Sequence, residues 1–220
     1  MNQEMLLLLQ NARHLGIELS EQQLAQFDVY KNELLQWNAK TNLISENSAQ
    51  EIITRHFLDS LTALQFIQNP AARIIDVGCG AGFPGLPLKI ALPTLELYLL
   101  ETNRKKVSFL KHMIRLLNLS DVVVLHDRTE NIIKTDTWKG KFDVLISRAA
   151  FKLSALLPQS EYFLVRGGKL IALKGPNVEG EITQCTSDTN KHKISQFIQH
   201  DINIPFLESQ RKIIIGAKKE

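Results

Sequence analysis

Through the first 70 residues, apolar positions recur every three or four residues, which is the spacing of amphipathic helices. Ser20 and Gln23 form a capping-box pattern, which predicts a helix that starts there and ends near Asn42. Ser48 and Glu51 repeat the pattern before a further helix. We therefore expect three helices in this region, none of them stable without a partner surface.

The helix after Ser48 has a polar face and an apolar stripe. The stripe, which we expect to be buried, is made of Ile52, Ile53, Phe57, Leu61 and Leu64. Arg55 and Asp59 stand four residues apart, the spacing of an ion pair on an exposed helix face. We predict that these two side chains pair on the surface.

From residue 73 onward the pattern changes, because short β-branched runs alternate with helical segments. This alternation is typical of a parallel sheet covered by helices. The predicted strands are residues 74–77, 95–100, 122–125, 142–146, 169–173, 194–202 and 213–217. The predicted helices are residues 85–92, 103–117, 153–165 and 178–190. The sequence thus predicts an α/β domain over residues 71–220 behind a helical segment over residues 1–70.

Composition and charge narrow the class of protein. Hydrophobic residues make up 44% of the 220 residues and charged residues 22%, which is typical of a folded globular chain. The longest apolar run, residues 5–9, is too short to span a membrane. Cys79 and Cys185 cannot form a disulfide framework, so we expect a cytoplasmic protein. The net charge is −4 over residues 1–70 and +7 over the remainder, which places any surface for an anionic partner in the later part.

A glycine-rich loop stands between the first predicted strand and the first covering helix. It reads Asp-Val-Gly-Cys-Gly-Ala-Gly-Phe-Pro-Gly over residues 76–85. Glycines such as Gly78 and Gly80 let a backbone turn sharply and approach a ligand closely, and the following helix presents its N–H groups. Glu101 ends the next strand, where a carboxylate can accept both hydroxyls of a ribose. Together these features predict a nucleoside cofactor.

Two departures from the dinucleotide-binding pattern G-x-G-x-x-G indicate which nucleoside fits. Phe83 occupies the position of the third glycine, so that the spacing here is G-x-G-x-G. Asp76 would lie unfavourably close to a pyrophosphate, but it suits a cationic or zwitterionic ligand. We favour S-adenosylmethionine, and a nicotinamide dinucleotide is the alternative.

Further motifs extend over nearly the whole chain. They are Trp37-Asn38 with Asn42-Leu43, Arg55-His56 with Asp59-Ser60-Leu61, the glycine loop as far as Pro87, Glu101 with Arg104-Lys105-Lys106, Arg128 with Glu130, and Ser147-Arg148-Ala149. With these motifs the sequence resembles the ribosomal RNA small-subunit methyltransferase G family, also called RsmG or GidB.

The resemblance implies a class I methyltransferase fold, in which a seven-stranded, mostly parallel sheet with an antiparallel last strand follows the helical segment. It implies methyl transfer from S-adenosylmethionine to guanine N7 in the decoding-region loop of 16S rRNA. The partner we expect is therefore the 16S rRNA or the small ribosomal subunit, and we expect a monomer that binds no membrane. Carried across motif by motif, the family's cofactor contacts fall on Gly78, Phe83, Thr129, Glu130 and Arg148.

The residues after the fourth predicted strand and the two cysteines indicate a methyl acceptor that needs no general base. Residues 147–150 read Ser-Arg-Ala-Ala, which differs from the Asn/Asp-Pro-Pro-aromatic loop common where exocyclic amines are methylated. Carbon-5 of a pyrimidine requires a nucleophilic cysteine, and we assign neither Cys79 nor Cys185 that role. Guanine N7 presents a free lone pair, so catalysis can rest on orientation and electrostatics. We assign Arg148 to the catalytic site, where it positions the acceptor base; the alternative is an arginine paired with a nearby carboxylate.

One face of the helix after Glu101 is cationic and the opposite face is apolar. The apolar positions, which we expect to be buried, are Val107, Leu110, Ile114 and Leu117. The cationic face can bind RNA phosphates, which gives a salt-sensitive affinity without sequence choice. The RNA-binding candidates are Arg104, Lys105, Lys106, Lys111, Arg115, Arg128 and Lys174, joined by Arg211, Lys212, Lys218 and Lys219.

Some functions are disfavoured and others stay open. His56, His112 and His126 lack the short spacings of metal ligands, so we expect no metal centre. A methyltransferase that acts on another RNA, a protein or a small molecule remains an alternative, because the fold alone does not choose the substrate. An inactive RNA-binding assembly factor that retains the nucleoside pocket is the other alternative.

Overall fold

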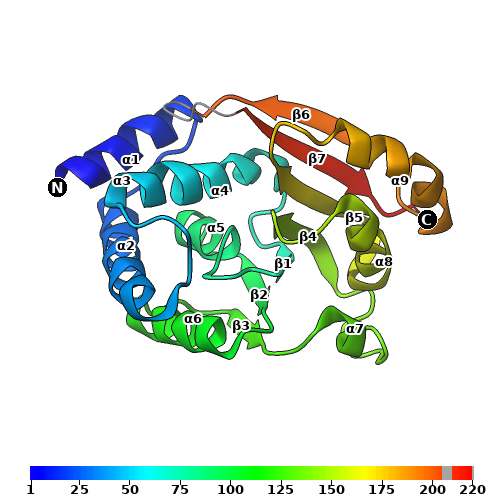
Figure 1. Ribbon diagram of the computed structural model, residues 1–220, viewed down its shortest axis with the longest axis horizontal. Helices are drawn as coiled ribbons and strands as arrows, with labels where there is room; N and C mark the ends of the chain where they lie inside the picture. The colour runs from blue at the N-terminus through cyan, green and yellow to red at the C-terminus, as the bar shows by residue number, and fades with distance from the viewer. Residues whose placement is uncertain (205–209, 220) are drawn as a thin grey trace.

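The computed structural model describes residues 1–204 and 210–219, apart from the side chains at positions 186 and 187. Figure 1 shows a central twisted sheet with helices on both faces, and the N-terminal helices lie along one side of it. The helical elements that precede the sheet are α1 (Gln3–His14), α2 (Glu21–Thr41), α3 (Ala49–Glu51), the π-helix η1 (Ile52–Leu58), α4 (Asp59–Leu61) and the 3-10 helix η2 (Thr62–Phe66).

The sheet and its covering helices follow in alternation, as the sequence pattern predicts. They are β1 (Arg73–Val77), α5 (Gly85–Ala91), β2 (Glu96–Leu100), α6 (Arg104–Leu116), β3 (Val122–Leu125), α7 (Thr129–Ile132), β4 (Phe142–Arg148), α8 (Leu153–Phe163), β5 (Leu164–Lys174), α9 (Glu179–Lys191), β6 (Ile198–Ile202) and β7 (Arg211–Ala217).

Within the described residues, seven strands form one sheet in the order β3-β2-β1-β4-β5-β7-β6. Strand β1 pairs in parallel with both β2 and β4. Strand β7, the last in the chain, runs antiparallel to both of its neighbours. The fold class expected from the sequence is therefore confirmed. The strand order reverses beside β1, and such a reversal leaves a crevice at the carboxyl ends of the strands where ligands bind.

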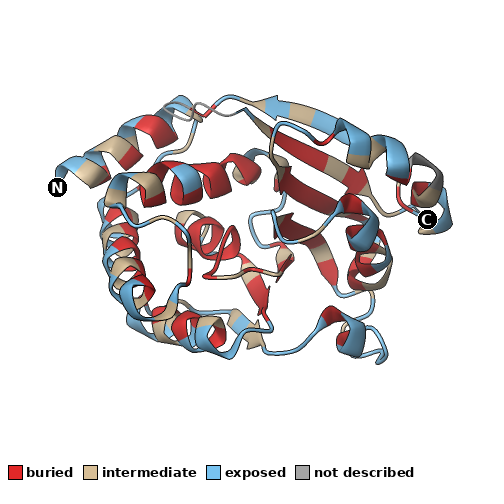
Figure 2. Ribbon diagram, in the orientation of Figure 1, coloured by how far each residue is buried: buried red, intermediate tan, exposed pale blue. Residues whose placement is uncertain are grey.

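Helices cover both faces of the middle of the sheet, where β1 and β4 are apolar and mostly buried, whereas the edge strands β3 and β6 are more exposed (Figure 2). Ile74 faces a core made with the N-terminal helices, α5 and α6, whereas Ile75 faces a second core made with α8 and α9. The helices before residue 70 thus share a core with the sheet. The boundary predicted after residue 70, at Asn69–Pro70, marks the passage from helices to strands rather than a division between cores.

The predicted helix ends are confirmed where side chains cap the backbone. The Ser20 side chain accepts the Gln23 N–H and the Gln23 side chain accepts the Ser20 N–H, so the capping box is complete. Helix α2 ends at Asn42, which adopts a left-handed conformation with φ of 52°. The Ser48 side chain accepts the Glu51 N–H at the start of α3.

The surface ion pair predicted between Arg55 and Asp59 is wrong. Asp59 is only 3% exposed and pairs with Arg148 and Arg211, whereas Arg55 pairs with Glu51. The prediction assumed a regular α-helix, but the segment contains a π-helix, whose wider turns change which residues share a face. The apolar stripe is nevertheless buried, except for Leu64, which is half-buried.

Several predicted boundaries also move. The helix expected to reach residue 165 ends at Phe163, because Leu164 pairs with Phe142 and starts β5. Strand β6 is shorter than predicted, and Ile194 instead forms an isolated bridge with Lys218. Strand β4 continues through Arg148. In each case pairing between distant segments overrides the local pattern.

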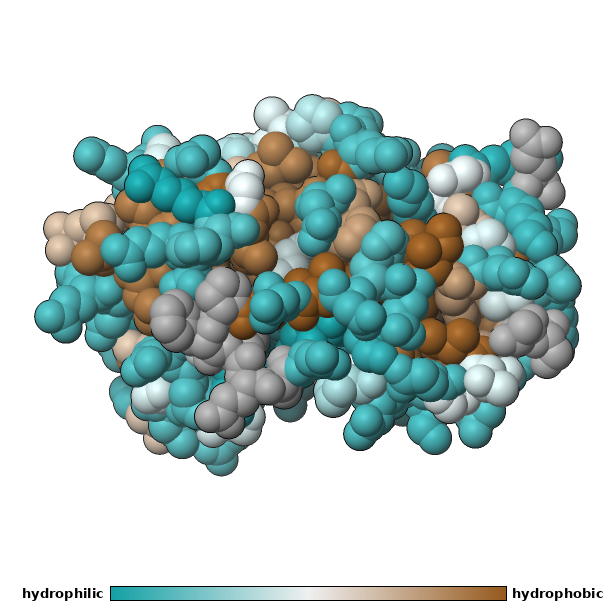
Figure 3. Space-filling view, turned by 90° about the horizontal axis from the view of Figure 1, so that it is seen from above, coloured by the Kyte–Doolittle hydropathy of each residue, from teal (hydrophilic) through white to brown (hydrophobic). Residues whose placement is uncertain are grey.

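Within the described residues, none of the helices combines the length and apolar character required to cross a bilayer. Figure 3 looks onto the side that carries α1 and β6, and its apolar patches are interrupted by polar side chains. The large apolar residues that are exposed come from different elements: Met1, Leu6, Val29, Leu116, Val123, Ile133 and Ile198. Scattered exposure of this kind is ordinary for a protein surface.

Candidate functional site

The glycine loop follows β1 at the carboxyl edge of the sheet. The backbone φ values of Gly78, Gly80 and Gly82 are 70°, 59° and 104°, a region that residues other than glycine rarely adopt. A Cβ atom at position 78 would also lie 2.7 Å from the Cβ atom of Ala150 and 2.8 Å from the Phe151 ring. The loop therefore needs glycine both for its conformation and for the close approach of the segment after β4.

Glu101 and Tyr30 hold this loop from two sides. The Glu101 Oε2 atom accepts the Gly80 N–H at 2.9 Å, while its Oε1 atom accepts the N–H groups of Thr102 and Asn103. The Tyr30 hydroxyl donates to the Ala81 carbonyl at 2.6 Å. The prediction from sequence placed Glu101 at the loop but missed Tyr30, because nothing local relates a buried tyrosine of α2 to a loop 51 residues later.

Asp76 lies beneath the loop and is fully buried. Its Oδ2 atom accepts the Gly85 N–H at 2.7 Å, but its Oδ1 atom has no hydrogen-bond partner among the described residues. Burial raises the pKa of this carboxyl to about 7, although the Gly85 N–H and the charge of Arg148 oppose the rise. A buried oxygen without a donor is costly unless a ligand supplies one.

An open cavity of about 230 Å³ lies over the loop. It is lined by Leu43, Ile44, Gly78, Cys79, Gly80, Ala81, Phe83, Lys106, Arg148, Ala149 and Ala150. The structure thus brings together Gly78, Gly80, Phe83 and Arg148, which the sequence proposed as cofactor contacts. Glu101 and Asp76 do not line this cavity themselves: they adjoin it through the loop, which Glu101 holds at Gly80 and Asp76 holds at Gly85. Together with the lining residues, these carboxylates fit a nucleoside that carries positive charge.

The N-terminal segment forms one wall of this cavity, through Leu43 and Ile44. Asn38 fixes that wall, since its Oδ1 atom accepts the Ile44 N–H at 2.9 Å and its Nδ2 atom donates to the Glu46 carbonyl at 3.1 Å. Asn38 is buried, so these bonds are shielded from water. The polar motif of α2 therefore shapes the site from a distance.

Arg148, the last residue of β4, is largely enclosed, with 15% of its side chain exposed. Its Nη1 atom donates to the Arg55 carbonyl at 2.7 Å and to Asp59 Oδ2 at 3.1 Å, and its Nη2 atom lies 2.6 Å from His56 Nδ1. The guanidinium also lies 5.0 Å from the centre of the Phe83 ring. Arg148 thus pairs with a carboxylate, that of Asp59, as the alternative of a carboxylate-paired arginine required. Asp59 is buried, however, and the pair lies beside the cavity.

Thr129 and Glu130 begin α7 at the same sheet edge, after β3. Thr129 is buried and Glu130 is exposed, and neither lines the cavity. Arg128, just before them, is exposed. The cofactor contacts that the resemblance placed on Thr129 and Glu130 remain predictions.

The RNA-binding candidates divide into exposed and internally bound cations. Arg104, Lys105, Lys111 and Arg115 are exposed on α6, whose opposite side is buried as predicted except for Ile114, which is half-buried. Several later candidates instead have partners within the protein. Lys174 binds the Phe151 carbonyl and Glu181, Arg211 pairs with Asp59, Lys212 with Glu179, Lys218 with two carbonyls and Lys219 with Asn190. Among these candidates, the exposed cations are therefore found mainly on α6.

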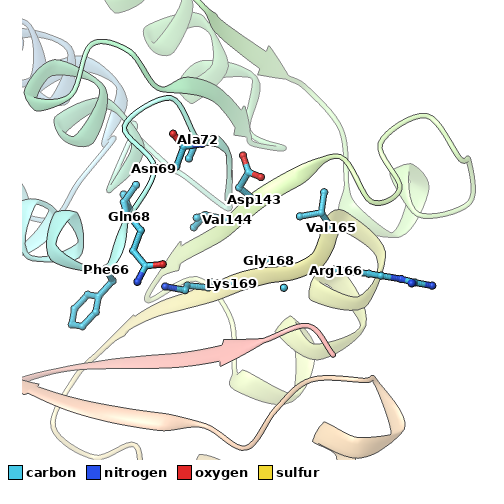
Figure 4. A pocket seen from close by; sticks show the side chains of 12 residues that line it. Phe66, Gln68, Asn69, Ala72, Asp143, Val144, Val165, Arg166, Gly168 and Lys169 are labelled. Atoms are coloured by element: carbon cyan, nitrogen blue, oxygen red, sulfur yellow. The ribbon is translucent and has the colours of Figure 1, made fainter. Parts of the chain in front are cut away.

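Another cavity of about 230 Å³ lies at the opposite, amino edge of β1, β4 and β5 (Figure 4). Asp143 and Lys169 line it, and Arg166 points away from it. None of the candidate site residues lies there, and ligands of such sheets bind at the carboxyl edge. Among the described residues, no group of three or more His, Cys, Asp or Glu side chains is placed to hold a metal ion.

Comparisons with known proteins identify the family to which the chain is similar. The GidB family, described as rRNA small subunit methyltransferase G, matches residues 23–214. The "Ribosomal RNA small subunit methyltransferase G" of Syntrophus aciditrophicus is 40% identical over 208 residues, which covers 94% of this chain and 86% of that protein. The protein of the same name from Chloroflexus aggregans is 43% identical over 176 residues, covering 80% of this chain and 74% of its own.

Solved structures are similar in fold. TYW2 of M. jannaschii, in complex with AdoMet, has a TM-score of 0.54 at 19% identity and covers 69% of this chain and 70% of that one. An rRNA methylase from Streptococcus thermophilus has a TM-score of 0.52 at 11% identity and covers 74% of this chain and 93% of that one. At such identities the likeness concerns the fold alone.

Proposed function

The chain belongs to the rRNA small-subunit methyltransferase G family, and we propose from this premise that it methylates guanine N7 in the decoding-region loop of 16S rRNA. It is an S-adenosylmethionine-dependent methyltransferase. When bound, the cofactor would supply an electrophilic methyl group on a sulfonium: the acceptor nitrogen bonds to the methyl carbon in line with the carbon–sulfur bond, which breaks, and the neutral thioether leaves. What remains for the protein is to bind, orient and exclude water.

Each cofactor contact has a separate role in this proposal. Glu101 accepts the ribose hydroxyls, and the backbone of Gly78 and Gly80 allows the ligand to approach closely. The Oδ1 atom of Asp76 gains a donor from the cationic end of the cofactor. Phe83 supplies an apolar surface above the loop. Thr129 and Glu130 complete the binding site from the adjacent strand end.

Arg148 orients the acceptor base. A guanidinium can donate two bonds to the edge of a guanine or stack on its plane. Its charge opposes the cation that forms on N7, so its contribution is to position the base rather than to stabilise the methylated product. Because N7 carries no proton, the mechanism needs no general base.

Helix α6 binds the phosphates of the rRNA. Helix α6 begins three residues after Glu101, so its cationic face adjoins the cofactor site. The cations of this face are Arg104, Lys105, Lys106, Lys111 and Arg115. Phosphate contacts position the substrate without reading its sequence. Arg128 extends this surface beyond β3.

One observation carries the proposal: the glycine loop, Glu101 and the unpaired Asp76 oxygen meet at one sheet edge, next to a cationic helix. The test is to incubate small ribosomal particles from cells lacking the protein with methyl-tritiated S-adenosylmethionine. Label at a guanine that becomes sensitive to reduction and aniline cleavage is expected. Label found only in protein or metabolites would refute the RNA substrate, and failure to bind the cofactor would favour the inactive assembly factor.

We further propose that the protein works as a monomer in the cytoplasm. The scattered apolar exposure and the two buried free cysteines support this view. Light scattering coupled to gel filtration should give one chain mass at micromolar concentration, and a dimer mass would contradict it.

A further inference from the structure

A second cavity, of about 200 Å³, adjoins the cavity over the glycine loop. The two share Arg148 and Ala149 in their walls. The second cavity is further lined by Glu46, Arg55, His56, Asp59, Leu173, Lys174, Gly175 and Arg211. An acceptor that reaches the cofactor from this side meets the Arg148 guanidinium, so the orientation of that group decides how the acceptor is presented.

The hydrogen-bond partners of Arg148 fix the protonation of His56. A guanidinium has donors and no acceptor, so in the 2.6 Å contact between Arg148 Nη2 and His56 Nδ1 the ring nitrogen accepts. The proton of a neutral ring must then be on Nε2, which lies 2.8 Å from Glu46 Oε2 and donates to it. Burial and the charge of Arg148 lower the His56 pKa to about 4, so the ring is neutral near pH 7.

Glu46 is itself held in place. The Ser45 hydroxyl donates to its Oε2 atom at 2.9 Å, and Asn38 donates to its backbone carbonyl. The side chains of Glu46 and His56 are 13% and 9% exposed, and the His56 ring stacks on Phe83 with the centres 4.6 Å apart. A fixed ring therefore stands between a fixed carboxylate and the guanidinium.

We propose that Glu46 and His56 are positioning residues for methyl transfer: Glu46 holds the proton of His56 on Nε2, so that Nδ1 stays free to hold Arg148 at the wall between the two cavities. This inference rests on the proposed function only for the methylation assay that tests it; the state of His56 can be measured without that assay. The same arrangement is known for histidines that bind metals, where a carboxylate behind the ring fixes its tautomer. Here the group in front of the ring is an arginine.

The remaining contacts of Arg148 do not replace this one. Asp59 shares its carboxylate between Arg148 and Arg211, and the Arg55 carbonyl binds the same Nη1 atom as Asp59 does. His56 alone among these partners holds Nη2. Without an acceptor at Nδ1, the guanidinium can rotate about the contacts at Nη1 while the rest of the site stays folded.

Glu46→Ala tests the proposal. The ring proton is then free to move to Nδ1, and a protonated Nδ1 cannot accept the hydrogen bond from Arg148 Nη2. We expect single-turnover methylation of 16S rRNA at saturating cofactor to fall about 10- to 100-fold, with the Kd for S-adenosylmethionine within about twofold of the parent. Glu46→Gln keeps an acceptor for Nε2–H and should recover most of the rate, whereas Glu46→Leu, which fills a similar volume without an acceptor, should not; equal rates of these two variants would indicate a packing role.

A matched control is available in the same protein. Glu33 Oε2 and His112 Nε2 form a pair of similar length, 2.7 Å, between α2 and α6, and it does not include Arg148. Glu33→Ala should leave the rate unchanged. In addition, His56→Asn keeps an acceptor for Arg148 but removes the link to Glu46, so adding Glu46→Ala to it should cause no further loss.

Nitrogen-15 spectra of the protein with labelled histidine read the tautomer without any activity assay. The parent should show Nδ1 of His56 as the unprotonated nitrogen, and Glu46→Ala should change that signal. A proton on Nδ1 in the parent, or a Glu46→Ala rate equal to that of the parent, would overturn the proposal. Failure of the parent itself to methylate rRNA would instead overturn the proposed function, and the spectra would still decide the state of His56.

Discussion

At the scale of single residues, Asp76 and Glu101 show how two carboxylates at adjacent strand ends acquire different chemistry. Both Glu101 oxygens accept backbone N–H groups, while Asp76 is fully buried with one oxygen unpaired. Burial without sufficient donors favours the protonated form of Asp76 and raises its pKa. Their equal formal charge therefore conceals two different environments.

Asp76→Asn should stabilise the cofactor-free protein increasingly as pH rises. The pKa of Asp76 is about 7 in the folded state against an ordinary value of 3.8. The favourable contribution of this acid is therefore fully present below pH 3.8, declines as pH rises and is lost above about pH 7. Urea unfolding at several pH values should show an advantage of the variant that grows to roughly 4 kcal/mol at most. An advantage that does not vary with pH would contradict the raised pKa.

Glu101→Ala should weaken S-adenosylmethionine binding by about 1 to 3 kcal/mol, the magnitude of hydrogen bonds to a charged group. Calorimetric titration measures this loss directly. Glu96→Ala is the control, because Glu96 begins the same strand at the opposite edge and pairs with Arg73. Equal affinity of the Glu101 variant and the parent would exclude the ribose contact.

At the scale of elements, α6 carries positive charge at its N-terminal end, where the helix is least stabilised by cations. Arg104, Lys105 and Lys106 occupy its first turn, which holds no acidic residue, although the helix dipole disfavours cations there. The Asn103 side chain caps the turn by accepting the N–H groups of Lys105 and Lys106. These three cations do not stabilise the helix, and their position is explained if they bind an anionic partner such as RNA.

The double variant Arg104→Glu with Lys111→Glu should weaken rRNA binding and make its salt dependence shallower, because fewer counterions are released. Cofactor affinity should be unchanged. Lys191→Glu with Lys193→Glu makes the same charge change at exposed positions at the far end of the molecule (Figure 1). If both pairs of substitutions alter the salt slope equally, the RNA surface is not centred on α6.

At the scale of the whole molecule, the N-terminal helices complete the site rather than precede it. Tyr30 binds the glycine loop, Leu43 and Ile44 line the cavity over that loop, and His56 binds Arg148. The same helices cover one face of the sheet, in a single core with β1, α5 and α6. Folding and site formation are therefore coupled.

The full chain should unfold in one cooperative transition, and residues 71–220 alone should not form a native sheet. Removing residues 1–70 would expose the core that they share with the sheet. Near-ultraviolet circular dichroism and amide dispersion in NMR spectra test this outcome. A fragment that is ordered and binds the cofactor would show that the division at Asn69–Pro70 separates two independent domains.

Sequence reasoning determined the features whose causes are local. Capping at Ser20 and Ser48, the alternation of strands and helices, the glycine loop and the placing of Glu101 all follow from neighbouring residues, and the structure confirms them. The two faces of α6 follow likewise from helical periodicity.

Only the tertiary structure decided which distant groups meet. The π-helical turn buries Asp59 against two arginines, and the fold brings Glu46, His56 and Arg148 into one row of hydrogen bonds. It also separates exposed cations on α6 from those, such as Lys174, that bind inside. Charge and hydrogen-bonding capacity are properties of residues, but their partners depend on how the segments pack, because electrostatic and hydrogen-bond energies depend on distance and burial.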